Sequence, residues 1–204
     1  MIIIIVGGIG SGKSLTMIKE LVSNSEKAEA YVNFRTKKIK GVHRMKMEYI
    51  LNYAEDKKGN RKPVSINYDF WRDLRVKKKR FSIYLDEVHN IINSRASMSK
   101  NNQLLTTWLA QIRKVFGKSE KDHLYLISQK IGRIDVALRD LAHIIIECKK
   151  IKKGKKVYVL QKYYNSLENY DIGKSFGGKV FYGNKYFEYY DSYELIDFGN
   201  EVYL

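Results

Sequence analysis

Residues 1–14 read MIIIIVGGIGSGKS, and the order of residue types in this stretch predicts how the fold begins. Residues 1–6 form a continuous apolar run that is β-branched from Ile2 onward, which is typical of a strand buried on both faces in a parallel sheet. A glycine-rich turn follows, and apolar residues at helical spacing begin at Leu15. The stretch therefore predicts a strand, a tight loop and a helix in direct succession.

The loop itself fits the pattern G-x-x-x-x-G-K-[ST] over residues 7–14. Glycines permit backbone torsions that turn successive N–H groups inward around a β-phosphate. Lys13 would place its charge on the β- and γ-phosphates, and the Ser14 hydroxyl would bind Mg²⁺. The helix that begins here adds the positive end of its dipole. The pattern predicts binding of ATP with Mg²⁺ through these residues: Gly8, Ile9, Gly10, Ser11, Gly12, Lys13, Ser14 and Leu15.

Polar side chains follow two further apolar strands. Phe81–Leu85 ends in two carboxylates, Asp86 and Glu87. Beside a phosphate loop, the first acid holds Mg²⁺ and the second acts as general base toward the attacking water, which indicates hydrolysis. Leu124–Ser128 ends at Gln129, whose amide could orient the water or sense the γ-phosphate. A solvated strand end is the alternative interpretation of Gln129.

The rest of the chain alternates between strand and helix patterns. The helix at 104–116 is predicted from five apolar residues on one face: Leu105, Trp108, Leu109, Ile112 and Phe116. The polar stretch 93–102 predicts a loop, and runs at 179–182 and 185–190 around Gly183-Asn184 predict a β-hairpin. Further strands are expected at 30–34, 142–148 and 157–164, and further helices at 45–54, 68–74 and 135–141.

These elements predict an α/β fold with a mostly parallel central sheet flanked by helices. We expect the core to occupy residues 1–150, and residues 151–204 to form a β-rich aromatic extension packed on it. No apolar run reaches the ~18 residues that span a bilayer, and the opening run lacks the features of a signal peptide. We therefore expect no membrane insertion and a location in the cytoplasm. The single cysteine, Cys148, excludes an internal disulfide.

The charge balance indicates a polyanionic partner. Thirty-eight Lys and Arg against 22 Asp and Glu give a formal charge of +16. Nucleic acid is the favoured partner. One alternative is an anionic membrane surface, and another is that the protein's surface is basic only for solubility. Basic runs at 35–40, 77–80 and 149–156 contain no base-reading pattern. If they are not simply solvated connectors, they should bind phosphates independently of sequence and with a steep salt dependence.

Three features together resemble a known family: the loop at 7–14, the acids Asp86 and Glu87, and the strand end at Gln129 after residues 113–117. They resemble the FtsK/HerA superfamily of DNA-pumping ATPases, which includes viral genome-packaging ATPases and Zot-like phage proteins. Within it, the sequence looks closest to the packaging ATPases of Sulfolobus turreted icosahedral viruses. The resemblance covers roughly residues 1–150. It implies a RecA-like core, a homo-oligomeric ring with a hexamer favoured, and translocation of double-stranded DNA into a preformed capsid.

The same resemblance implies roles for single residues. Lys13 and Ser14 match the nucleotide loop, Asp86 and Glu87 match the metal ligand and the base, and Gln129 matches the polar sensor. An arginine that precedes the sensor strand in the family matches Arg113, the candidate for a finger that reaches a neighbouring subunit; its rivals are Arg133, Arg139 and Arg95. Proteins of the viral capsid vertex are possible partners.

Three other functions stay open from the sequence. A Zot-like assembly ATPase would extrude single-stranded phage DNA at a membrane, and the missing membrane segment counts against it. A nucleoside or small-molecule kinase could use the same loop, but adjacent Asp86 and Glu87 favour water as the phosphate acceptor. A nucleotide-gated DNA-binding subunit without enzymatic activity would have no use for Glu87.

Overall fold

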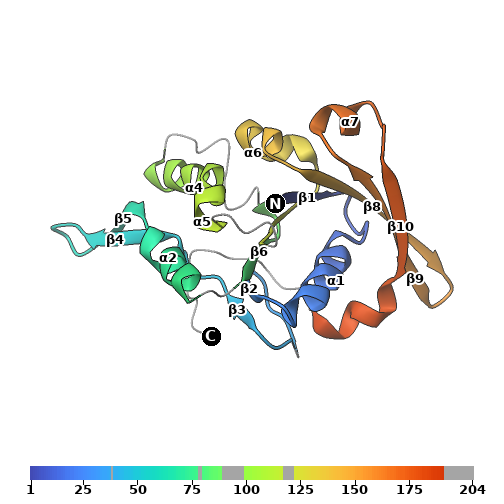
Figure 1. Cartoon of the computed structure of the whole chain (residues 1–204), viewed down its shortest axis with the longest axis horizontal. Helices are drawn as coiled ribbons and strands as arrows, with labels where there is room; N and C mark the ends of the chain where they lie inside the picture. Colours follow the sequence, from blue (N-terminus) through green and yellow to red (C-terminus); the bar gives the residue numbers. More distant parts are fainter. Residues whose placement is uncertain (38, 78–79, 89–98, 117–121, 191–204) are drawn as a thin grey trace.

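A computed structural model describes residues 1–37, 39–77, 80–88, 99–116 and 122–190. Its centre is an eight-stranded sheet with helices on both faces (Figure 1). The strand order is β10-β9-β8-β1-β7-β6-β2-β3. The bounds of these strands are β1 Ile2–Val6, β2 Glu29–Val32, β3 Val42–Arg44, β6 Phe81–Leu85, β7 Leu124–Ser128, β8 Ile144–Lys153, β9 Lys156–Tyr164 and β10 Gly177–Tyr182.

Six neighbouring strands of this sheet are parallel. β1 lies between β7 and β8, and β7, β6, β2 and β3 follow in parallel on one side. β9 and β10 add an antiparallel edge on the other side, next to β8. The predicted α/β class with a mostly parallel sheet is confirmed. The expected division at residue 150 falls within β8, which pairs continuously with β9 from Ile145 to Lys153.

The helices cover two separate apolar cores. The α-helices are α1 Lys13–Ser25, α2 Tyr68–Val76, α4 Lys100–Ala110, α5 Ile112–Phe116, α6 Val136–Asp140 and α7 Leu167–Asp171; the 3₁₀ helices are η1 Met47–Tyr49, η3 Ile131–Arg133 and η4 Gly183–Tyr189. Ile3 and Ile5 of β1 face the core under α1, whereas Ile2 and Ile4 face the core that contains Trp71 and Trp108. Alternate residues of β1 thus divide between the two cores, as a doubly covered strand requires.

The helix expected at 45–54 is wrong. The segment contains η1 and then β4 (Leu51–Glu55), which pairs with β5 (Arg61–Ile66) in a separate two-stranded hairpin that projects from the body (Figure 1). Asp56 closes its turn, because the Oδ1 atom accepts hydrogen bonds from the N–H groups of Lys58 and Asn60. Pro63 is tolerated within β5, since the register is irregular there and the hairpin has only two strands.

The hairpin expected around Gly183-Asn184 is also wrong, because the chain continues from β10 into η4. Asn184 binds the backbone of the neighbouring hairpin instead: its Oδ1 accepts from the Val157 N–H at 2.7 Å and its Nδ2 donates to the Lys155 carbonyl at 2.9 Å. A Cβ on Gly183 would lie 3.2 Å from Leu15. The Gly-Asn pair therefore serves close docking against β9 and α1.

Three smaller differences concern boundaries. The helix predicted at 104–116 is divided at Gln111 into α4 and α5, although all five of its predicted apolar residues are buried. Residues 93–98 of the predicted polar loop lie outside the described residues, and 100–102 begin α4. The basic run 149–156 belongs to the β8–β9 hairpin, with its turn at Gly154 and Lys155. Within the described ranges, no helix has the length and apolar character needed to cross a membrane.

Candidate nucleotide site

The loop between β1 and α1 depends on glycine at two close approaches. Gly7 has φ 149°, and a Cβ there would lie 2.5 Å from Ser11 Oγ and 2.7 Å from the Cys148 carbonyl oxygen of β8. Gly12 has φ 95°, and its Cβ would lie 2.7 Å from a methyl group of Val159 in β9. Neither position accepts a side chain without displacement, so β8 and β9 hold the loop from behind.

The Lys13 ammonium lies inside this loop. Its Nζ donates hydrogen bonds to the carbonyl oxygens of Gly7 at 2.9 Å and Gly8 at 3.0 Å. Burial lowers the pKa of Lys13, against the opposing effect of the negative charges of Glu87 and Asp86. The loop thus holds a buried cation that phosphate oxygens can bind in place of the two carbonyl groups.

The other predicted loop residues differ in what they offer a phosphate. Ser11 Oγ is buried and has no hydrogen-bond partner among the described residues, which suits a hydroxyl next to an anion site. Ile9 is 88% exposed at the tip of the loop. The Leu15 side chain is buried in the core under α1, so its contact with a nucleotide is limited to the backbone N–H. Lys150 of β8, which sequence reasoning placed only in a basic run, has its Nζ 3.6 Å from the position of a Cβ on Gly10.

The order β1-β7-β6 brings Asp86 next to the loop, because the carboxyl ends of these parallel strands meet at one edge. Ser14 Oγ donates to Asp86 Oδ2 at 3.4 Å. Burial raises the pKa of Asp86 to about 6, and the neighbouring charge of Glu87 adds to the shift. One hydroxyl and one carboxylate oxygen fit Mg²⁺, which keeps waters and takes further oxygens from phosphates. Consistently, no three His, Cys, Asp or Glu residues in the described part of the chain cluster as a protein-only metal site.

Asn33, which the sequence analysis did not single out, fixes the backbone of Asp86. Its Nδ2 donates to the Asp86 carbonyl at 2.8 Å, and its Oδ1 accepts from the Asp86 N–H at 2.7 Å. The side chain is only 2% exposed, just beyond the end of β2. Asn33 lies inside the strand expected at 30–34, so the available signal was a polar side chain within an apolar run, unlike Gln129, which follows its strand.

Glu87 and Gln129 lie together at the ends of adjacent strands. Gln129 Nε2 donates to Glu87 Oε1 at 3.4 Å, and the Glu87 N–H donates to Asp86 Oδ1 at 2.8 Å. Glu87 has φ 47°, in the left-handed region that residues other than glycine rarely occupy. Such backbone strain persists where the surroundings hold a residue in place, and it is frequent at functional sites.

The candidate arginines are placed differently from one another. Arg133 Nη1 donates to Gln129 Oε1 at 3.2 Å, which extends the Glu87–Gln129 contact to an exposed arginine of the same subunit. Arg113 lies in α5, and its side chain is not among the described ones. Arg139 lies in α6, and Arg95 lies outside the described residues.

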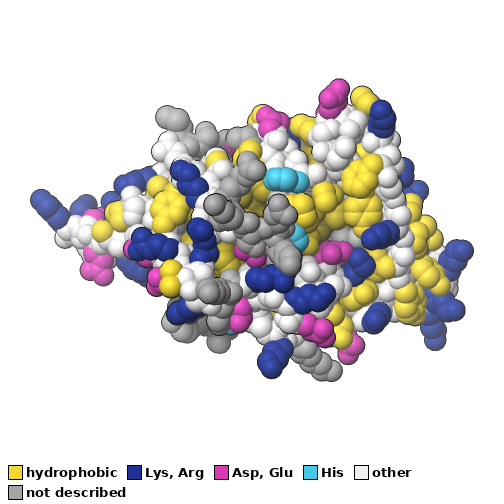
Figure 2. Space-filling model, viewed as in Figure 1, with side chains coloured by type: hydrophobic (Ala, Val, Ile, Leu, Met, Phe, Trp, Pro, Cys, Tyr) yellow, Lys and Arg dark blue, Asp and Glu magenta, His cyan; other side chains and the backbone are white. Residues whose placement is uncertain are grey.

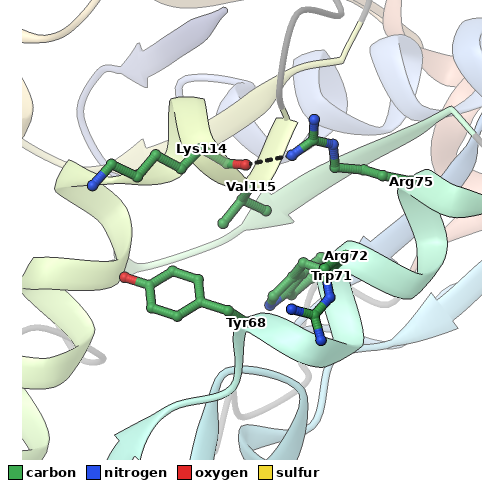
Figure 3. Close-up of a pocket in the computed structure, with 6 residues that line it drawn as sticks. All are labelled: Tyr68, Trp71, Arg72, Arg75, Lys114 and Val115. Atoms are coloured by element: carbon green, nitrogen blue, oxygen red, sulfur yellow. Dashed lines mark hydrogen bonds between the residues drawn. The ribbon is translucent and has the colours of Figure 1, made fainter.

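A separate pocket of about 170 Å³ opens between α2 and α5 (Figure 3). It is lined by Tyr68, Trp71, Arg72, Arg75, Lys114 and Val115. One of its arginines is already engaged, because Arg75 Nη1 donates to the Lys114 carbonyl at 2.8 Å. None of its lining residues belongs to the phosphate loop or to the strand ends around it, so it is not part of the nucleotide site.

A phosphate loop between a parallel strand and a helix, facing an acid at the end of the strand next but one, defines a P-loop NTPase. Within that class, the Zonular occludens toxin (Zot) family matches residues 1–195, and the chain therefore belongs to that family. The match supports the coarser expectation of a viral P-loop ATPase. It falls on the Zot-like proteins, which the sequence analysis treated as an alternative, and the narrower resemblance to FtsK/HerA packaging ATPases stays a prediction.

The fold is similar to that of one solved domain, and two further solved structures show weaker similarity. The N-terminal domain of zonular occludens toxin from Neisseria meningitidis is 16% identical, with a TM-score of 0.55 over 93% of this chain and 98% of that chain. A genome packaging NTPase from Sulfolobus turreted icosahedral virus 2, solved with ATP-gammaS, is 13% identical, with a TM-score of 0.44 over 88% and 95%. A KaiC-like protein from Pyrococcus horikoshii is 11% identical, with a TM-score of 0.47 over 89% and 83%. The comparison with curated proteins found no match.

Proposed function

We propose that this chain is an ATPase that moves DNA during the assembly of a virus particle. The observation that carries the proposal is the arrangement of two adjacent acids at one strand end. The buried Asp86 faces the Ser14 hydroxyl, and Glu87 faces Gln129 on the next strand. A protein that only binds nucleotide needs the first acid but not the second, which is the group that activates water.

The proposed reaction assigns each group a step. The Glu87 carboxylate accepts a proton from water, and the water oxygen attacks the γ-phosphorus of ATP. The bond between that phosphorus and the oxygen bridging to the β-phosphate breaks, and the charge on the departing ADP is balanced by Lys13. Mg²⁺ held by Ser14 and Asp86 would neutralise charge on the β- and γ-phosphate oxygens. Asn33 holds the Asp86 backbone at the required position.

DNA is the proposed polymer because the formal charge is +16 and the basic runs carry no base-reading pattern. Following the family resemblance, we propose double-stranded DNA entering a preformed capsid, with vertex proteins as partners. A homo-oligomeric ring, with a hexamer favoured, would bring several copies of one basic surface around the DNA and raise avidity. Arg113 is the first candidate to reach a neighbouring subunit in such a ring, and Arg133 is the second.

A second candidate is the export of single-stranded phage DNA by a Zot-like assembly ATPase. The observation in its favour is the Zot family match, which extends over residues 1–195. Both candidates use the same chemistry at Glu87 and differ in the strand state of the DNA. The preference of the stimulated ATPase for single or double strands therefore distinguishes them.

The test is phosphate release from ATP, measured without DNA, with duplex DNA and with single-stranded DNA of the same sequence. We expect DNA to stimulate turnover in the wild type. Glu87→Gln should lower turnover by about 10²–10⁴-fold while retaining ATP binding, because a general base contributes about that factor. Lys13→Ala should weaken ATP binding as well. Turnover that no nucleic acid changes would overturn the motor, and phosphate transfer to a nucleoside in place of water would identify a kinase.

A further inference from the structure

The outer face of the β8–β9–β10 edge carries an apolar centre among lysines. Side chains alternate along a strand, and Cys148, Val157 and Val159 face the core under α1. Residues one position away from these along each strand therefore face the opposite side. Here we call this opposite surface the tyrosine–lysine face; its centre is Ile151, Tyr158, Leu160, Val180 and Tyr182, and its lysines are Lys149, Lys153, Lys156 and Lys162.

The strand register places these side chains in rows. Tyr158 pairs with Ile151 on one side and with Tyr182 on the other, and in the next row Leu160 pairs with Lys149 and Val180. The two tyrosine rings lie 5.6 Å apart at 54°. Val180 is 59% exposed, Tyr182 45% and Ile151 37%. In Figure 2, hydrophobic and basic surface lie side by side at the end of the molecule where Figure 1 places these strands. Exposed apolar groups in contiguous rows are typical of a binding surface.

The charges on this face point to an anionic ligand. All four lysines are exposed, and none of them is in an ion pair within the described part of the chain. Lys153 and Lys156 stand directly opposite each other in the register, an arrangement that costs stability when nothing neutralises it. Among the described residues of β8, β9 and β10, Glu147 is the one acid on this face; it stands opposite Lys162 in the register, and its carboxylate accepts a hydrogen bond from the Tyr164 hydroxyl at 2.9 Å.

We propose that the tyrosine–lysine face binds single-stranded DNA, with bases against Tyr158 and Tyr182 and phosphates against the lysines. Aromatic rings on a sheet surface among cations form a stacking platform for unpaired bases, with little sequence preference. A duplex would leave the apolar centre unused, because the flat faces of its bases are stacked on one another and cannot lie against an aromatic ring. The site rests on the second candidate of the proposed function, the handling of single-stranded DNA, and deepens it by naming a surface for that strand on the same chain.

The opposite side of the same strands contacts the phosphate loop. Val159 packs against Gly12 between the face residues Tyr158 and Leu160, and the Lys150 ammonium lies near Gly10 between Lys149 and Ile151. A displacement of these strands on DNA binding would therefore be transmitted to Gly10 and Gly12, because the residues that touch the loop are the sequence neighbours of the face residues. Because coupling between two sites is reciprocal, ATP should change the affinity for single-stranded DNA by the same factor by which DNA changes the affinity for ATP.

The closing experiment measures fluorescence anisotropy of a labelled oligothymidine of about 16 nucleotides, a length that covers one such platform. It uses the whole chain without nucleotide. We expect Tyr182→Ala and Tyr158→Ala each to raise the Kd at least about fivefold, and Tyr182→Phe to keep wild-type affinity because the ring remains. The matched aromatic control is Phe187→Ala in η4, since Phe187 is 47% exposed and lies outside the face. A double variant, Lys153→Gln with Lys156→Gln, removes charge without removing packing, so it tests the face even if a tyrosine variant fails to fold.

Four outcomes would overturn the proposal. The first is wild-type affinity in both the tyrosine and the lysine variants, and the second is a loss of affinity in these variants that is equal for duplex and single-stranded DNA. The third is displacement of the oligonucleotide by a peptide of residues 191–204. The fourth is self-association of the wild type that disappears in Tyr182→Ala. The peptide is the relevant competitor because it contains four acids and no Lys or Arg. Since binding is measured without ATP, a failure here is distinct from a failure of the ATPase, which the Glu87→Gln assay reports.

Discussion

At the scale of single residues, the burial of Asp86 links the nucleotide site to pH. Its pKa is raised to about 6, so the carboxyl binds its proton more tightly in the folded than in the unfolded protein. The stability that this group contributes is therefore present at low pH and is lost as the pH rises from about 4 to about 6. Without metal, the ionised carboxylate at neutral pH then destabilises the fold.

We predict that Asp86→Asn, studied without Mg²⁺ or nucleotide, raises the free energy of unfolding at pH 8 by about 2–3 kcal/mol. The gain should disappear near pH 4, where the wild-type carboxyl is also neutral. Urea unfolding with a chelator across this range measures the effect. The control is Asp69→Asn, because the Asp69 side chain is 75% exposed. A gain that stays the same at every pH would show that the proton on Asp86 is not its cause.

The same scale shows what a sequence reveals about a site. The placement of Lys13, Ser14, Asp86 and Glu87 at one edge of the sheet could be predicted, because the phosphate loop is contiguous and an apolar strand ends directly in acids. Asn33 could not be assigned to Asp86, because the two are 53 positions apart and meet only through the pairing of β2 with β6. Local patterns identify such groups, whereas their partners depend on strand order.

At the scale of elements, the buried strands could be predicted, because a continuous apolar run fits few other structures. The errors fall where a short segment takes its conformation from a distant neighbour. Only the first half of the segment 45–54 is helical, as the short η1, because the second half belongs to β4 and pairs with β5. At 183–190, the Gly-Asn pair suits a hairpin turn by its residue types, but the Asn184 side chain instead binds the backbone of the β8–β9 hairpin. Neither outcome can be read from the local residues alone.

We predict that Asn184→Ala lowers the free energy of unfolding by about 1–3 kcal/mol, because it leaves the Val157 N–H and the Lys155 carbonyl without their partner. Denaturant unfolding measures the loss. The control is Asn165→Ala, since Asn165 is exposed and its side chain accepts a hydrogen bond from the side chain of Asn169, with no backbone partner among the described residues. Equal effects in the two variants would mean that η4 is held by its apolar contacts with α1 rather than by Asn184.

At the scale of the whole molecule, the formal charge of +16 raises the question of whether DNA binding is diffuse or local. Diffuse attraction depends on total charge, so removing any two lysines should weaken it similarly. At a local site, each lysine that contacts a phosphate releases counterions from the DNA and so adds to the salt dependence of binding. Removing lysines of that site therefore changes the salt dependence, whereas removing lysines elsewhere does not. The two cases differ in the slope of log Kd against log salt concentration rather than in affinity at one salt concentration.

For single-stranded DNA held by the four lysines of the tyrosine–lysine face, the slope of log affinity against log salt should be about −3. Lys153→Gln with Lys156→Gln should make it shallower by about 1.4, since each phosphate contact contributes about 0.7 for a single strand. Lys57→Gln with Lys58→Gln, in the exposed β4–β5 turn, lowers the formal charge by the same two units and should leave the slope unchanged. Titrations at several salt concentrations measure all three slopes. Equal changes in both double variants would mean that the whole positive surface, and no particular face, attracts the DNA.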